Sequence, residues 1–139
     1  MVNNINTHHV ATQLVRQFHR AVQAHDAAEA AGDETAERIL FARVMALAEE
    51  VSFHPAGSPE AALYMAQLLR CDVGASRSCV ESEYETETRL DRMERLAVSL
   101  VNYLERTSGI DRTDWRLDWY GGKECDGQAF GSISPVFAA

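Results

Sequence analysis

The sequence lacks the features typical of membrane, nucleic-acid-binding and secreted proteins. No apolar run approaches the roughly 20 residues that a membrane-spanning helix needs. Basic residues number 13 against 21 acidic ones, and the resulting formal charge of −8 disfavours direct binding to nucleic acid. The N-terminus has neither a basic region nor an apolar stretch, so we expect no secretory signal and a cytoplasmic protein.

Cysteine is also scarce, and the three cysteines form no Cys-x-x-Cys pair. An odd number of cysteines is typical of free thiols in a reducing compartment. A bridge between Cys71 and Cys79 would close a short loop, and the sequence leaves that alternative open. Cys125 has no obvious partner.

Catalytic signatures are missing as well. The chain has no nucleophile elbow, no cysteine-protease signature and no glycine-rich loop that opens a helix around a phosphate. Gly121-Gly122 is not followed by a helical pattern. We therefore expect a protein that is not an enzyme and that carries no cofactor.

Helical periodicity dominates residues 7–108. Apolar residues recur there at steps of three and four, which is typical of amphipathic helices. Gly32-Asp33 indicates a tight turn between antiparallel helices, and Ser58-Pro59-Glu60 supplies a cap, a first-turn proline and a favourable charge for a helix start. The prediction is an all-α four-helix bundle, with helices at about 7–31, 34–52, 59–71 and 80–107.

Between the last two helices we expect a loop over 72–79. The pairs Glu85–Arg89 and Asp91–Arg95 have the favourable four-residue order of an exposed helix face. The buried side of the fourth helix is then expected to hold its apolar residues, namely Leu90, Met93, Ala97, Leu100, Val101 and Leu104.

The character of the chain changes at Gly109, so we divide it into a bundle, 1–109, and a C-terminal extension, 110–139. The extension holds both tryptophans but no continuous helical period. A Gly-Gly hairpin would mix acidic with aromatic side chains on one face, which favours a short helical turn over 113–120, with 123–139 mostly irregular. Such a segment must dock on the bundle, on a second copy or on a partner. The expected contact residues are Trp115, Trp119, Phe130 and Phe137.

Two histidine-based hypotheses compete with this interpretation. His25 and Glu29 lie one helical turn apart and, with His19, are the candidate ligands of a metal site in the bundle, although no Glu-x-x-His motif occurs. A helical bundle of this size also resembles the histidine phosphotransfer domain in outline. The chain nevertheless reads His25-Asp26-Ala27-Ala28-Glu29 where that family has lysine and glycine beside its histidine.

The Ala- and Asp/Glu-rich helical hairpin, the proline-containing turn and the start Ser58-Pro59-Glu60-Ala61-Ala62 resemble a loose group of small, uncharacterised bacterial proteins. Some of that group are carried on mobile elements. The resemblance spans about residues 20–107 and implies a helical fold without implying an activity.

Together these patterns predict a non-enzymatic protein–protein interaction or regulatory module that binds an unidentified protein or a second copy of itself. A metal- or ligand-binding bundle is the first alternative. A second alternative starts from the acidic run 81–87, which either stabilises a helix N-terminus or lets the chain inhibit a nucleic-acid-binding protein. A histidine phosphotransfer-like domain is the third.

Overall fold

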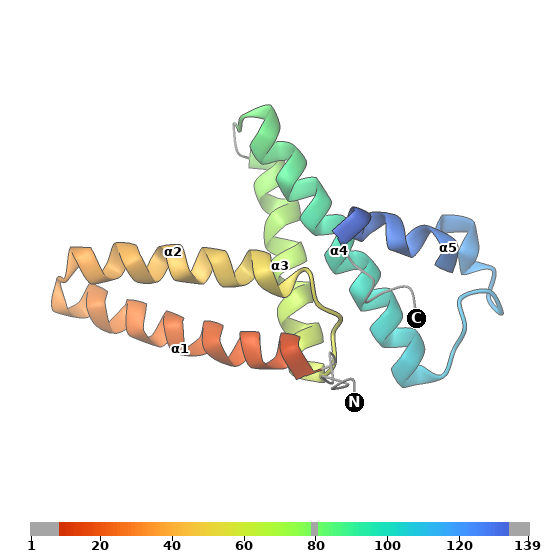
Figure 1. The fold of residues 1–139 in the computed structure, drawn as a ribbon, viewed down its shortest axis with the longest axis horizontal. Helices are drawn as coiled ribbons and strands as arrows, with labels where there is room; N and C mark the ends of the chain where they lie inside the picture. The colour runs from red at the N-terminus through yellow and green to blue at the C-terminus, as the bar shows by residue number, and fades with distance from the viewer. Residues whose placement is uncertain (1–8, 79–80, 134–139) are drawn as a thin grey trace.

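A computed structural model describes residues 9–78 and 81–133, and these residues form the all-α fold that the periodicity predicts. Four main helices pack in two pairs, α1 with α2 and α3 with α4 (Figure 1). Their bounds are Val10–Ala31 for α1, Glu34–Val51 for α2, Pro59–Ser78 for α3 and Glu83–Ser108 for α4. Three short helical segments follow: η2 (Leu117–Tyr120), α5 (Lys123–Asp126) and η3 (Gly127–Ile133).

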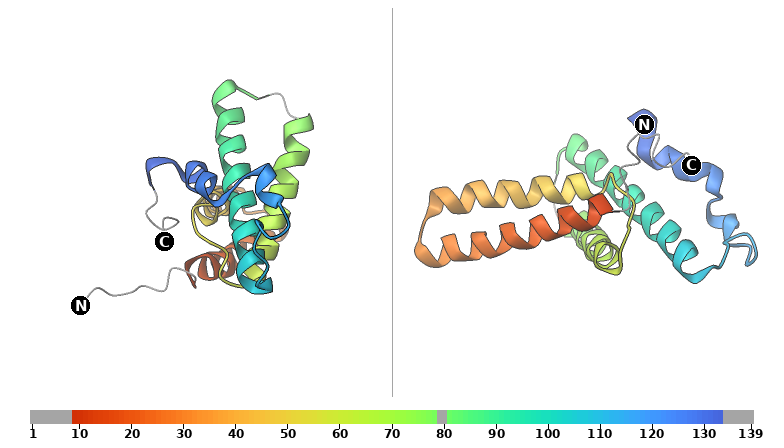
Figure 2. Two further views of the ribbon diagram at one scale, coloured as in Figure 1. Left: turned by 90° about the vertical axis from the view of Figure 1, so that its right-hand side faces the viewer. Right: turned by 60° about the horizontal axis from the view of Figure 1, so that its bottom comes forward.

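The hairpin of α1 and α2 turns where the sequence predicts. Gly32 ends α1 in the left-handed conformation at φ 69°, which glycine adopts without steric cost. The Asp33 carboxylate then accepts a hydrogen bond from the Ala36 N–H at 3.0 Å and so caps α2. The hairpin crosses the α3–α4 pair at one end and projects away from it at the other (Figures 1 and 2).

The start of α3 also follows the prediction, but its end does not. Ser58 caps the helix by accepting a hydrogen bond from the Ala61 N–H at 3.2 Å. The helix then runs on to Ser78, through most of the stretch expected to be a loop. Within this added stretch Asp72 is buried and paired with Arg92 of α4, and the helix continues through Gly74 although glycine inside a helix costs about 1 kcal/mol.

The hydrophobic core lies where the hairpin crosses the α3–α4 pair. Full burial of one large apolar side chain stabilises the fold by about 1.5–3 kcal/mol. The Phe18 and Tyr64 rings meet edge to face, 4.7 Å apart, and join α1 to α3. The fully buried large apolar residues are Leu47 and Val51 of α2, Met65 of α3 and Leu96 of α4.

Both ends of α4 carry sequence-encoded caps. Ser82 and Glu85 form a capping box, in which each side chain bonds the other's backbone N–H, and Gly109 ends the helix at φ 71°. Beyond Gly109 the chain doubles back and η3 packs on α4 (Figure 1). Residues 123–133 are short helices rather than the irregular chain predicted for 123–139, and residues 134–139 lie outside the described structure.

Candidate interaction surface

The side of α4 that faces away from α3 carries a continuous line of exposed residues at alternating steps of four and three. These steps place the side chains in one row along a helix. We call this row the outer stripe; it consists of Glu83, Glu87, Leu90, Glu94, Ala97, Val101, Leu104 and Ser108, all of them exposed.

The outer stripe corrects the prediction of which side of α4 is buried. Leu90, Val101 and Leu104, expected in the core, are 52%, 41% and 61% exposed, and Ala97 is exposed as well. Only Met93 and Leu100 of the predicted set are half-buried. The face that α3 covers instead centres on Leu96 and Ser99, flanked by three arginines, Arg89, Arg92 and Arg95. Arginine is mostly exposed in folded proteins, so the sequence favours burial of the more apolar face of α4.

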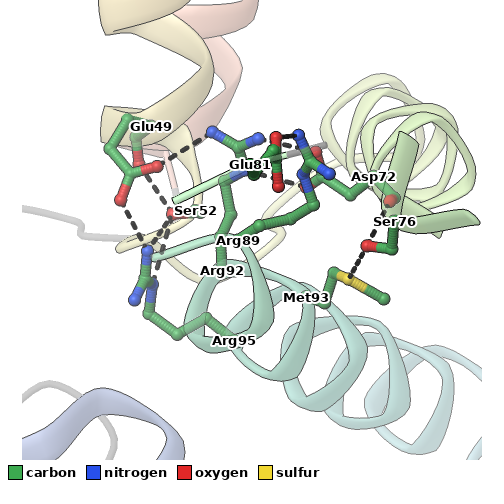
Figure 3. Close-up of polar contacts among 9 residues, drawn as sticks. All are labelled: Glu49, Ser52, Asp72, Ser76, Glu81, Arg89, Arg92, Met93 and Arg95. Atoms are coloured by element: carbon green, nitrogen blue, oxygen red, sulfur yellow. Dashed lines mark hydrogen bonds and ion pairs between the residues drawn. The ribbon is translucent and has the colours of Figure 1, made fainter. Parts of the chain in front are cut away.

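Two arginines of the inner face, Arg92 and Arg95, are held by carboxylates from other helices (Figure 3). Arg92 binds Asp72 of α3 through two hydrogen bonds of 2.6 and 2.8 Å, and it binds Glu49 of α2 at 3.0 Å. Arg95 binds the same Glu49 at 2.8 Å and donates to the Ser52 hydroxyl. The bond to Asp72 raises the pKa of Arg92, so its charge is permanent. These contacts fasten α4 to the other helices.

Two predicted surface pairs are replaced by these contacts. Arg95 pairs with Glu49 instead of the predicted Asp91. Its guanidinium carbon also lies over the Phe53 ring, 3.9 Å from the ring centre. Arg89 pairs with Glu81 rather than with Glu85, whose carboxylate binds Ser82. Partly buried partners prevail because water screens an exposed i,i+4 pair.

Arg112 fastens the chain beyond Gly109 to α4. Its side chain is only 6% exposed and forms two parallel hydrogen bonds of 2.9 Å with Asp126. It also binds Glu105 at 2.8 Å and Asn102 at 2.9 Å, both on α4. The hydrogen bond from Arg112 lowers the pKa of Glu105, which keeps that carboxylate ionised near neutral pH. The sequence analysis does not predict this cluster. The one sequence feature that indicates it is the position of Arg112, an arginine between two acidic segments.

The loop that Arg112 holds forms one wall of a groove along the outer stripe. The groove has a volume of about 660 Å³, which is within the size range of ligand-binding clefts. Its lining combines an apolar set of residues with the charged Glu94, Glu105, Arg112 and Asp126. The apolar lining comprises Ala97, Val98, Val101 and Leu104 of α4 together with Ile110 and, in η2, Leu117. We call this feature the α4 groove.

The four predicted contact residues separate in the structure. Trp115 and Trp119 are 70% and 81% exposed, so they do not anchor the C-terminal segment on this chain. Arg116, between them, adopts the left-handed conformation at φ 57° and interrupts the single helical turn predicted over 113–120. Phe130, in contrast, is only 3% exposed and lies in η3 next to α4. Phe137 lies outside the described residues.

The candidate metal ligands come together in part. One nitrogen of His25 and one carboxylate oxygen each of Asp26 and Glu29 lie within 4.8 Å of one another. His19 is exposed and sits six residues before His25, so it is on another face of α1. His25 is half-buried, near the Phe41 ring of α2. Within residues 9–78 and 81–133 no other such group of three occurs.

Tyr64, Cys71 and Cys125 are weaker candidates for a functional site than the His25 group. Burial raises the pKa of the Tyr64 hydroxyl to about 12, so it is protonated at neutral pH. Cys71 and Cys125 are exposed free thiols, and the bridge considered for Cys71 has its other cysteine, Cys79, outside the described residues.

Comparison of the chain with family models, with curated proteins and with solved structures found no match. The resemblance to small bacterial helical proteins therefore stays a prediction. Among the described residues, no helix is long and apolar enough to cross a membrane.

Proposed function

We propose that the chain is a non-enzymatic protein–protein interaction module that binds its partner along the outer stripe and in the α4 groove. One observation carries the proposal: Val101 and Leu104 in the apolar half of the stripe face solvent, although the opposite side of the same helix buries Arg95, Leu96 and Ser99. Exposed apolar patches of this kind, bordered by polar residues, are typical of binding sites for other proteins.

The surroundings of the groove support the same role. Trp115 and Trp119 remain exposed beside Leu117, one of the groove-lining residues. Tryptophan is enriched among the residues that contribute most to protein–protein binding. The buried charged groups, among them Asp72, Arg95 and Arg112, are engaged in ion pairs between elements, which supports a structural rather than a chemical role for them.

The test is capture of partners from the native host with Val101→Asp. A carboxylate among the apolar residues that line the groove should reduce recovery of bound partners at least about tenfold, because it must be desolvated on binding. Ile39→Asp is the matched control, since Ile39 is 65% exposed on α2, away from α4. Equal recovery with both variants and with the unchanged chain would contradict the proposal.

A second candidate function is metal binding by His25, Asp26 and Glu29. The closeness of one imidazole and two carboxylates favours it, since zinc accepts both ligand types. Titration of the purified chain with zinc should give one bound ion that His25→Ala removes and His19→Ala leaves in place. An unchanged titration in His25→Ala rules the site out.

A further inference from the structure

We propose that the outer stripe binds one helix of a partner protein, with lysines and arginines along one half of that helix and apolar residues along the other. This inference rests on the proposed function and adds the chemistry of the partner. The charge pattern along α4 carries it.

The spacing of the stripe favours a helical partner. Its residues follow the seven-residue repeat that keeps one helix in contact with another along its length. From Glu83 to Leu104 the row spans about 30 Å, given a rise of about 1.5 Å per residue. A helix of about 20 residues would therefore cover it. The groove beside Val101 and Leu104 leaves room for the larger side chains of that helix.

The two halves of the stripe differ in chemistry. The N-terminal half holds three glutamates, Glu83, Glu87 and Glu94, with Leu90 between them. The C-terminal half has no charged residue and consists of Ala97, Val101, Leu104 and Ser108. None of the three glutamates forms an ion pair or a hydrogen bond with a side chain of the described residues, whereas Glu81, Glu85 and Glu105 of the same region are bound. The chain as a whole carries a charge of −8. Unpaired carboxylates in line with an apolar row are complementary to a helix that is basic at one end.

A second copy of the chain fits this surface poorly. Parallel pairing of two α4 helices would set Glu87 against Glu87 and Glu94 against Glu94. Antiparallel pairing centred on the stripe would set Glu87 against Leu104 and Glu94 against Ala97, which buries carboxylates without cations. Neither arrangement satisfies the charges, whereas a basic partner helix does.

The experiment uses the full chain and two labelled synthetic peptides of about 22 residues. Both peptides have the same leucine-containing apolar half; the other half carries Lys and Arg in one peptide and Glu in the second. Each peptide is made in two versions, one with the charged half at its N-terminus and one with the apolar half there. Both versions are needed because the stripe does not determine whether the partner helix runs parallel or antiparallel to α4. Fluorescence anisotropy gives the Kd. We expect the basic peptide to bind at least about tenfold more tightly than the acidic one, with an advantage that shrinks as salt is added.

Charge reversal then tests whether the stripe is the site. The double variant Glu87→Lys, Glu94→Lys should weaken binding of the basic peptide about tenfold and strengthen that of the acidic one. The double variant Glu34→Lys, Glu50→Lys makes the same change of net charge on exposed residues of α2 and should leave both Kd values within about twofold. Both variants replace exposed residues, and circular dichroism checks that each is folded.

Three results would overturn the inference. One is equal or tighter binding of the acidic peptide; another is equal weakening by both double variants, which would indicate net charge alone. The third is a dimer in sedimentation that Val101→Asp dissociates, because it would place a second copy on the stripe. If one of these results is obtained but Val101→Asp still captures fewer partners from the host, the proposed function holds and only the basic partner helix is ruled out. If Val101→Asp loses none, the proposed function itself fails.

Discussion

Single arginine side chains hold the helices and the C-terminal segment together. Arg92 and Arg95 join α4 to α2 and α3, and Arg112 joins the chain after Gly109 to α4. A guanidinium suits this work because its planar set of donors binds carboxylates through two bonds at once. Removing one partner of a buried pair is costly, because the other charge is left without compensation.

Arg112→Met should therefore release the C-terminal segment while the four main helices stay folded. Two carboxylates, Glu105 and Asp126, would then lose their hydrogen bonds to a charged partner while only 16% and 15% exposed, at a cost of about 2–3 kcal/mol. Hydrogen exchange over residues 117–133 measures the loss of protection. Arg116→Met is the matched control: Arg116 is 82% exposed, so its loss should cost less than about 0.5 kcal/mol. Equal protection in the two variants would contradict this role of Arg112.

The same cluster implies a dependence on pH. Because Arg112 lowers the pKa of Glu105 in the folded chain, Glu105 contributes stability above its unfolded pKa of about 4.3. That contribution is lost as pH falls through the lower, folded pKa. Protection of residues 117–133 should thus decline in acid in the unchanged chain, and the difference from Arg112→Met should shrink. A difference that stays constant down to pH about 2 would show that Glu105 is not involved.

Among the elements, α4 shows most clearly what the sequence reveals and what it conceals. Gly109 is a local signal that predicts where α4 ends, and the predicted start near residue 80 lies within a few residues of the observed start at Glu83. Its orientation depends on tertiary contacts. The helix has two seven-residue rows, and the sequence alone favours burial of the row with Val101 and Leu104. The structure buries the row with Arg92 and Leu96, because Glu49 and Asp72 reach it from other helices.

The C-terminal segment and α3 follow the same rule. The sequence identifies the residues between Gly109 and Ile133 as a segment that needs a surface, and Phe130 does lie buried near α4. The sequence does not show that Arg112 binds this segment to α4. It also does not predict that Trp115 and Trp119 face solvent. The end of α3 was misplaced because the pairing of Asp72 with Arg92 is invisible in a single segment. Pairings distant in sequence therefore account for the part of the candidate site that could not be predicted.

At the scale of the whole molecule, the two helix pairs cross and leave α4 between α3 and the C-terminal segment (Figures 1 and 2). The C-terminal segment covers part of the outer side of α4 and leaves the apolar half of the outer stripe open next to it. The result is a helix buried on one side and available on the other, with two exposed tryptophans on the adjoining loop. This arrangement fits a chain that presents α4 to another protein.

Photo-crosslinking in the native host tests that central claim most directly. A photoreactive amino acid at Leu104, which is 61% exposed in the stripe, would be compared with the same group at Ile39, which is 65% exposed on α2. If α4 is the binding surface, the group at position 104 forms a crosslink to a partner protein and the group at position 39 forms none. A crosslink from position 39 alone, or from neither position, would contradict the assignment of α4 as the binding surface.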